Sequence, residues 1–134
     1  QRRHEPVSLA FVDLDRFKHI NDTWGHEEGD RALIAIADLM KAAFRESDIL
    51  ARQGGDEFII LFANTSRHDA ATAMETLSHN VARFNQQAAN PWQLAFSWGC
   101  VEYDPASHHS LNALVATADR LMYQAKQKQG RERR

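Results

Sequence analysis

Apolar residues along this chain recur with two different spacings, which predict strands and helices in turn. Residues 8–13 form a short apolar run that stops at an acid, and this length predicts a buried strand. Apolar residues three and four positions apart predict amphipathic helices over residues 30–44, 67–85 and 111–128. The polar segment before the first of these helices opens a helical turn at Phe17 and Lys18. It also contains Gly25 and Gly29, which we expect to break regular structure.

Two further strand-like runs, residues 48–52 and 57–62, flank the pair Gly54-Gly55 and predict a β-hairpin. A type I′ turn would suit this pair, because glycine adopts positive φ without strain. Residues 94–101 predict a last strand, so the expected order is β-α-α-β-β-α-β-α. This mixed order indicates an α+β fold, a mostly antiparallel sheet flanked by helices, rather than a doubly wound parallel sheet.

Composition narrows the class of protein. The 134 residues are enough for one domain, and 43% hydrophobic with 25% charged residues is an ordinary globular balance. Sixteen Lys and Arg against 18 Asp and Glu argue against a protein that binds chiefly to nucleic acid. A single cysteine excludes a disulfide within the chain, and no apolar run is long enough to span a membrane. The chain lacks a signal peptide and an initial Met, so we expect a piece of a longer cytoplasmic protein.

Acidic residues follow two of the predicted strands. Asp13 and Asp15 end the first strand, and either could simply cap the helical turn that follows. Asp56 and Glu57 come directly after the Gly-Gly pair, where two adjacent carboxylates repel each other. If the two strands are neighbours, Asp13, Asp56 and Glu57 converge into an oxygen cage suited to Mg²⁺. Two such ions can activate a hydroxyl group and stabilise a leaving pyrophosphate.

Other polar groups suit a nucleotide. The free N–H groups of a helical turn at Phe17 and Lys18 would seat a phosphate. Asn21 and Asp30 offer hydrogen-bonding groups that suit a guanine edge, although Asn21 is equally typical of a loop. Cations at the end of the last helix either bind a triphosphate or are simply a solvated helix end.

Three motifs together resemble the GGDEF family, the bacterial diguanylate cyclases. The pentapeptide GGDEF occupies residues 54–58, and the pattern DxDxFKxxNDxxGHxxGD occupies residues 13–30. The segment DRLMYQAK at residues 119–126 follows at the family's spacing, so the resemblance covers almost the whole chain. It implies condensation of two GTP into cyclic di-GMP with release of two pyrophosphates. It also implies the palm-like fold of nucleotidyl cyclases and polymerases.

The resemblance assigns roles to single residues. It makes Asp13 a shared ligand of two Mg²⁺ ions, or of Mn²⁺, with help from the Leu14 carbonyl. Asp56 is then the second ligand, and Glu57 is a ligand or the base that acts on the ribose 3′-hydroxyl. The residues that it implies for GTP are Asn21 and Asp30 at guanine, the Phe17 and Lys18 main chain at phosphate, and His26, Gly54, Gly55, Lys126 and Arg131.

A product-inhibition site is also implied, in which an RxxD motif precedes GGDEF by five residues. Arg45 and Asp48 stand at that register and would bind cyclic di-GMP, although the same pair is common as a surface salt bridge. The end of the last helix departs from the family pattern by one extra residue, which leaves Lys128 and Arg131 as alternatives at phosphate. The family's helical segment before the first strand is absent.

Catalysis in this family needs an antiparallel homodimer, because two nucleotides must face each other. The resemblance also implies an N-terminal sensory domain in the full-length protein, which could be membrane-anchored. It implies that this domain contacts neither a membrane nor nucleic acid. Two alternatives are a catalytically silent GGDEF domain that senses GTP or cyclic di-GMP, and a scaffold for a partner protein.

Overall fold

The computed structural model describes residues 5–132, with side chains described as far as residue 129. The element order is the one predicted, β-α-α-β-β-α-β-α. Its elements are β1 (Val7–Leu14), α1 (Phe17–Trp24), α2 (His26–Ala43), β2 (Ile49–Arg52), β3 (Glu57–Ala63), α3 (Arg67–Gln87), β4 (Phe96–Glu102) and α4 (Leu111–Glu132).

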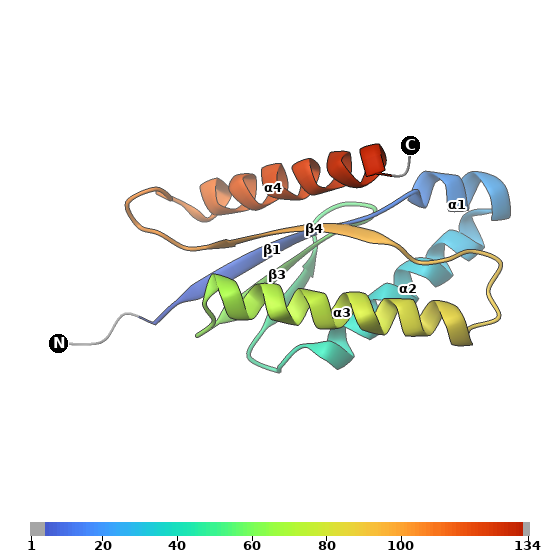
Figure 1. Ribbon diagram of the computed structural model, residues 1–134, viewed down its shortest axis with the longest axis horizontal. Coiled ribbons are helices and arrows are strands. Elements are labelled where there is room, and N and C mark those ends of the chain that lie inside the picture. The colour runs from blue at the N-terminus through green and yellow to red at the C-terminus, as the bar shows by residue number, and fades with distance from the viewer. Residues whose placement is uncertain (1–4, 133–134) are drawn as a thin grey trace.

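The four strands form one sheet in the order β2-β3-β1-β4, and every neighbouring pair is antiparallel. This confirms the expected α+β architecture. The first strand lies inside the sheet, between the second strand of the hairpin and β4. In Figure 1, α4 runs along one face of the sheet, and α2 and α3 lie on the opposite side. The C-terminal end of α4 and helix α1 lie at the same end of the molecule, away from the N-terminus.

Side chains of β1 alternate between two hydrophobic cores, because successive residues of a strand point to opposite faces. Ala10 and Val12 are fully buried in the larger core, against α2 and α3. Leu9 and Phe11 face the other way and pack with Leu114, Ala118 and Met122 of α4. The same alternation directs Asp13 to the face of the sheet that α4 covers.

Helix α4 packs directly against the backbone of β4. The contact is at Gly99, where an added Cβ would collide with backbone atoms of Ala118, Leu121 and Met122. Backbone atoms cannot move aside as the end of a flexible side chain can, so only glycine fits here. The helix also continues past the predicted end at residue 128, to Glu132. Across residues 5–132, no helix combines the length and the apolar character that crossing a membrane requires.

The predicted start of α2 is also wrong. Helix α2 begins at His26 rather than residue 30, so only one of the two expected glycine breaks exists. Gly25 has φ of 96° and separates α1 from α2, a conformation that favours glycine. Gly29 lies inside α2 and is buried, and a Cβ there would collide with the side chain of Asn21. Its small size therefore serves the packing of α2 against α1.

The hairpin is present, but its expected type I′ turn is wrong. Neither Gly54 nor Gly55 has positive φ, which a type I′ turn requires at both central residues. The strands are instead joined by a four-residue loop, residues 53–56. The carbonyl of Glu57 accepts hydrogen bonds from the N–H groups of Gln53 at 2.8 Å and Gly54 at 3.3 Å. Because this loop is longer than a two-residue turn, Asp56 lies in the loop, just before β3 begins.

We predict that Gly99→Ala destabilises the fold by about 1–3 kcal/mol, because the new methyl group must push α4 away from β4. The midpoint of urea unfolding measures this loss. Gly55→Ala is the matched control, since a Cβ at Gly55 meets nothing within 4 Å. Equal stability of the two variants would contradict the backbone contact described above.

Candidate functional site

Three polar residues form a row across the end of the sheet. Asp13 pairs with Glu57 of β3 on one side and with Ser97 of β4 on the other. Residues paired across antiparallel strands point to the same face, so all three side chains face α4. We call Asp13, Glu57 and Ser97 the acidic row. Its two carboxylates lie directly opposite each other, which is unfavourable unless a cation lies nearby.

That cation is Lys126, which the apolar stripe of α4 brings to the row. Leu114, Ala118, Met122 and Lys126 follow one another at intervals of four, so they share one face of the helix. The Lys126 Nζ atom donates a hydrogen bond of 2.9 Å to Asp13 Oδ2. Partial burial lowers the pKa of Lys126, but the hydrogen bond and charge of Asp13, with nearby acids, outweigh it and raise that pKa. Lys126 therefore stays charged.

Asp15 belongs to the same cluster, and the alternative that it caps α1 does not hold. Its residue is 6% exposed, and its Oδ1 atom accepts a 2.8 Å hydrogen bond from the Ser97 hydroxyl. Lys126 Nζ lies 3.8 Å from the same oxygen. The residue at the N-cap of α1 is Arg16, which makes no side-chain cap hydrogen bond. The sequence signal for Asp15 was its place two residues after Asp13.

Two oxygen atoms in this cluster have no partner. Asp13 Oδ1 and Asp15 Oδ2 are buried without a hydrogen bond. A buried carboxylate oxygen without a partner is costly, and a divalent cation is a common way of satisfying it. Asp13 therefore fits the role of a Mg²⁺ ligand that the motifs imply. The N–H of Leu14 donates to the Asp56 carbonyl at 3.0 Å, which brings the peptide of Leu14 beside Asp56.

The hairpin contributes two carboxylates, Asp56 and Glu57, whose pKa values are both raised. Burial, followed by the charge of Asp13, raises the pKa of Asp56. The pKa of Glu57 is raised by burial and then by the charges of Asp13, Asp56 and Asp119. Lys126 acts in the opposite direction on both groups. The acids of the two strands thus lie close enough to act on one another, as the sequence predicted.

They do not, however, form the expected three-carboxylate cage. Within residues 5–132, no three His, Cys, Asp or Glu side chains gather closely enough to hold an ion. One reason is Glu57, whose Oε1 would lie 2.9 Å from a Cβ added at Gly54, so its carboxylate lies beside the loop. The second reason is Lys126, which already occupies Oδ2 of Asp13.

The N-terminus of α1 is open where a phosphate is expected. The first N–H groups of a helix have no partner inside it, and here no side chain caps them. Phe17 and Lys18 begin this helix, three residues beyond the end of β1. The Lys18 side chain pairs with Asp22 at 2.7 Å, so the expected contact depends on its main chain.

The expected guanine-reading residues lie on two adjacent helices. Asn21 is on α1, against Gly29, and Asp30 is exposed one position farther along α2. His26 is exposed at the first position of α2. The structure thus brings the three to the α1–α2 pair, at the same end of the fold as the acidic row. Arg131 is also expected to contact GTP, but its side chain lies outside the described side chains.

Arg52 braces the hairpin loop, a role that the sequence did not reveal. Its Nε atom donates to the carbonyls of Gly54 and Gly55 at 3.1 Å, and its Nη2 atom donates to Gly55 at 2.6 Å. One guanidinium thus holds both glycine carbonyls. The loop next to Asp56 is therefore held in shape although its glycines leave it free of side chains.

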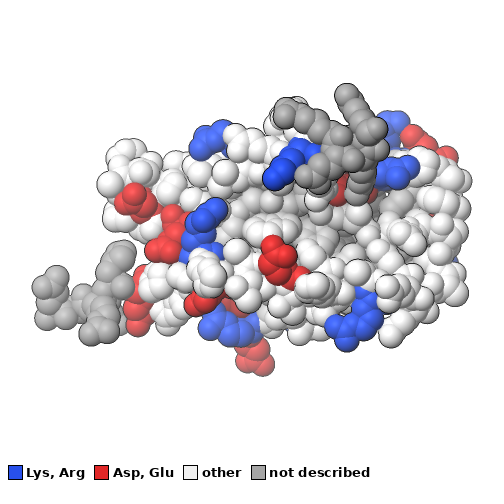
Figure 2. Space-filling view, viewed as in Figure 1, with Lys and Arg blue, Asp and Glu red and all other residues white. Residues whose placement is uncertain are grey.

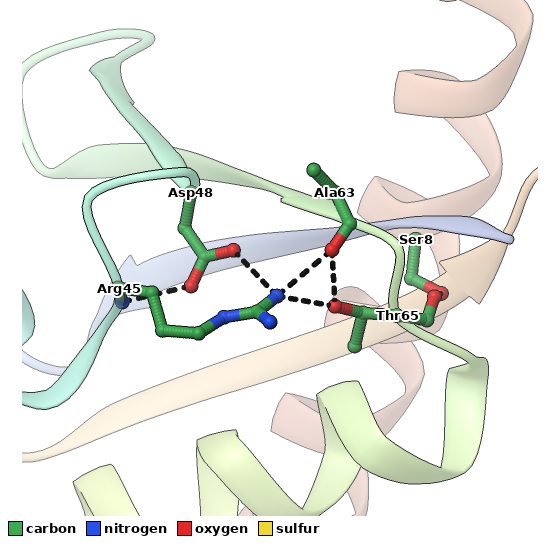
Figure 3. A network of polar contacts seen from close by, with 5 residues as sticks. All are labelled: Ser8, Arg45, Asp48, Ala63 and Thr65. Atoms are coloured by element: carbon green, nitrogen blue, oxygen red, sulfur yellow. Dashed lines mark hydrogen bonds and ion pairs between the residues drawn. The ribbon is translucent and has the colours of Figure 1, made fainter. Parts of the chain in front are cut away.

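Arg45 and Asp48 of the RxxD motif form the salt bridge that their spacing suggests, and Arg45 also bonds to Ala63 and Thr65 (Figure 3). Arg45 Nη2 donates to Asp48 Oδ1 at 3.2 Å, to the Ala63 carbonyl at 2.8 Å and to Thr65 Oγ1 at 2.7 Å. Ser8 extends the network by donating to the Thr65 carbonyl at 2.8 Å. The Arg45 side chain is still 58% exposed, and its partner Asp48 is 4% exposed.

A hollow of about 200 Å³ lies beside this pair and includes Phe44, Arg45 and Asp48 in its lining. A base could enter it with the guanidinium on one side. On the face shown in Figure 2, Lys and Arg side chains are interspersed with Asp and Glu.

Comparison with known proteins gives consistent matches. A family model described as "Diguanylate cyclase, GGDEF domain" matches residues 1–133. Diguanylate cyclase DosC of Escherichia coli K12 is 35% identical over 132 residues, which are 98% of this chain and 28% of DosC. The chain spans about a third of the length of the curated relatives that it matches.

Solved structures match equally well. An EAL/GGDEF domain protein from M. capsulatus has a TM-score of 0.82 and 35% identity, covering 96% of this chain and 83% of that one. The GGDEF domain of DgcB from Caulobacter crescentus, solved in complex with c-di-GMP, has a TM-score of 0.82 and 28% identity. That match covers 92% of this chain and 74% of that one.

The raised pKa of Asp56 predicts that Asp56→Asn stabilises the fold near neutral pH. A carboxyl group with a raised native pKa favours folding below its unfolded value, 3.8, and this stability is lost as pH rises through the native pKa. The variant should therefore raise the thermal unfolding midpoint at about pH 7 and have little effect at about pH 3.

Asp22→Asn is the control for this prediction, because Lys18 lowers the pKa of Asp22. Its effect should have the opposite sign or be absent. If Asp56→Asn shifted the midpoint equally at both pH values, ionisation of Asp56 would not be the cause.

Proposed function

Because the chain belongs to the GGDEF family of diguanylate cyclases, we propose that it condenses two GTP into cyclic di-GMP. Two pyrophosphates are released. The observation that carries the proposal is the acidic row of β1 and β3 beneath Lys126, with an unpartnered oxygen on Asp13. The relative DosC, named a diguanylate cyclase, supports it.

Each copy of the chain holds one GTP in this proposal. Asn21 and Asp30 bind the guanine edge, and the open N–H groups at the start of α1 bind the outer phosphates. Lys126 contributes a positive charge to the triphosphate. The bare loop at Gly54 and Gly55 gives the nucleotide access to the strand ends.

Asp13 and Asp56, with the Leu14 carbonyl, would hold two Mg²⁺ ions, or Mn²⁺ in their place. Bound magnesium would lower the pKa of the 3′-hydroxyl and balance charge on the phosphates. Glu57 acts beside them as a further ligand or as the base that receives the hydroxyl proton. Burial and the neighbouring acids raise the pKa of Glu57, which makes its ionised carboxylate a stronger proton acceptor.

Two copies of the chain are needed for the reaction. Each 3′-hydroxyl must reach the α-phosphorus of the other nucleotide, so two sites must face each other in an antiparallel homodimer. Orientation of two bound reactants is by itself a large contribution to rate. A catalytically silent GGDEF domain that only binds GTP is the alternative. It would bind GTP through the same residues but form no cyclic di-GMP, so a measurement of turnover separates the two.

Arg45 and Asp48 support a second role, binding of the product. The exposed part of the Arg45 guanidinium faces solvent beside a hollow of about 200 Å³. Planar guanidinium groups pair well with phosphate and with guanine. The structural neighbour DgcB was solved in complex with c-di-GMP. Cyclic di-GMP bound here would inhibit the enzyme that makes it.

We predict that Asp13→Asn lowers turnover by a factor on the order of 10²–10³, because the site loses a charge that acts in the transition state. Turnover is measured as GTP consumed and cyclic di-GMP formed with Mg²⁺, on the chain fused to a dimeric coiled coil. Asp69→Asn, an exposed acid on α3, is the control and should be fully active. Absence of product from the folded wild-type fusion would refute the proposed reaction.

We predict that Arg45→Ala weakens binding of cyclic di-GMP roughly tenfold or more, as expected for losing hydrogen bonds to a charged group. Isothermal titration calorimetry measures it. Thr65→Val is the matched control, because it removes one internal partner of Arg45 and leaves the guanidinium in place. Equal losses in both variants would show that the Arg45 network is purely structural.

A further inference from the structure

Lys126 lies between two carboxylates, and the proposed function uses only one of them. Its Nζ atom is 2.9 Å from Asp13 Oδ2 and 3.8 Å from Asp15 Oδ1. The first distance is a hydrogen bond, and the second is an ion pair without one. A small rotation of the flexible lysine side chain would exchange the two distances.

Asp15 is built into the fold as a second acceptor. The Ser97 hydroxyl donates to its Oδ1, and its own N–H donates to the Ala95 carbonyl at 2.8 Å. These contacts fix the position of the carboxylate. Its Oδ2 atom is buried and unpartnered, and the residue is 6% exposed. A buried acid with one free oxygen beside a lysine is not needed for capping or for core packing.

A divalent cation at Asp13 Oδ1 would weaken the hold of that carboxylate on the Lys126 ammonium at Oδ2. Both are positive, and a cation bound to Asp13 would repel an ammonium held on the same carboxylate. Without a second acceptor, Lys126 would leave the site when the cation arrives. The structure provides that acceptor at 3.8 Å.

We propose that Lys126 exchanges between Asp13 and Asp15. It neutralises Asp13 when no divalent cation is bound, and it moves onto Asp15 when a cation takes Asp13. Asp15 is therefore a positioning residue, which keeps the lysine charge inside the loaded site. The inference rests on the cation site of the proposed function, but not on the cyclisation of GTP.

The test is a titration of the nucleotide-free chain with Mn²⁺ alone, followed by electron paramagnetic resonance. Lys126→Met removes the competing ammonium, so Mn²⁺ should bind roughly three- to tenfold more tightly, the range of a partly buried ion pair. Arg120→Met also loses a positive charge from α4, at an exposed position six residues before Lys126, and should change affinity less than twofold.

The role of Asp15 is tested by a double-mutant cycle. Asp15→Asn keeps the size and the Ser97 hydrogen bond, so the variant should fold. It should weaken Mn²⁺ binding in wild type, because the displaced Lys126 has no acceptor. In the Lys126→Met background the loss should be clearly smaller. Equal losses in both backgrounds would mean that Asp15 acts only through its charge, and the exchange would be wrong.

Lys126→Gln is a second variant, in case Lys126→Met does not fold. It keeps a hydrogen-bond donor for Asp13 without the charge, and it should also tighten Mn²⁺ binding. Unchanged or weaker binding in both Lys126 variants, or no Mn²⁺ binding by any variant, would overturn the exchange. A chain that binds Mn²⁺ in the expected order yet forms no cyclic di-GMP would refute the proposed reaction and leave the exchange standing.

Discussion

The close contact of α4 with β4 at Gly99 determines the geometry of the rest of the site. Because the helix backbone rests directly on the strand, its rotation and height over the sheet are fixed. The stripe that begins at Leu114 then delivers Lys126 to the strand end within hydrogen-bonding distance of Asp13. A helix set farther away by one methyl group would separate these charges, which belong to the first and last elements of the fold.

The acidic row has a cost that the rest of the fold compensates. Asp13 and Glu57 face each other across two strands, and Asp56 adjoins them, so each disfavours ionisation of its neighbours. Lys126 offsets part of this repulsion, and Arg52 holds the loop that carries Asp56. The strain is local, because fully apolar packing begins again one turn of α4 away. Such a concentration of unfavourable charge is typical of a functional site.

Most of the fold could be predicted from the sequence, because apolar spacing is a local signal. The strands, the hairpin and the long helices appear within a few residues of their predicted bounds. The sequence pattern fails where tertiary contacts decide: it predicts a break at Gly29, but this glycine lies inside α2 and serves packing against α1. The loop at Gly54 likewise takes its shape from Arg52 and Glu57 rather than from glycine alone.

The site divides along the same line. The sequence names Asp13, Asp56 and Glu57, because the motifs and the strand order place them together. It gives Asp15 only a capping role and Ser97 none, because their contact depends on a register between β1 and β4 that no local pattern specifies. The expected three-acid cage failed for a similar reason. Which way Glu57 turns, and which oxygen Lys126 occupies, are properties of side chains in three dimensions.

The ion pair between Lys126 and Asp13 joins residues 113 positions apart in the chain. During synthesis, β1 and the hairpin leave the ribosome long before α4 exists, so the acidic row and the apolar face beside it stay uncovered until α4 follows. Closing so long a loop is an entropic cost that is recovered only when α4 docks. The site is consequently completed only after α4 has been made, and a chain that stops before α4 carries its acids without the lysine that balances them.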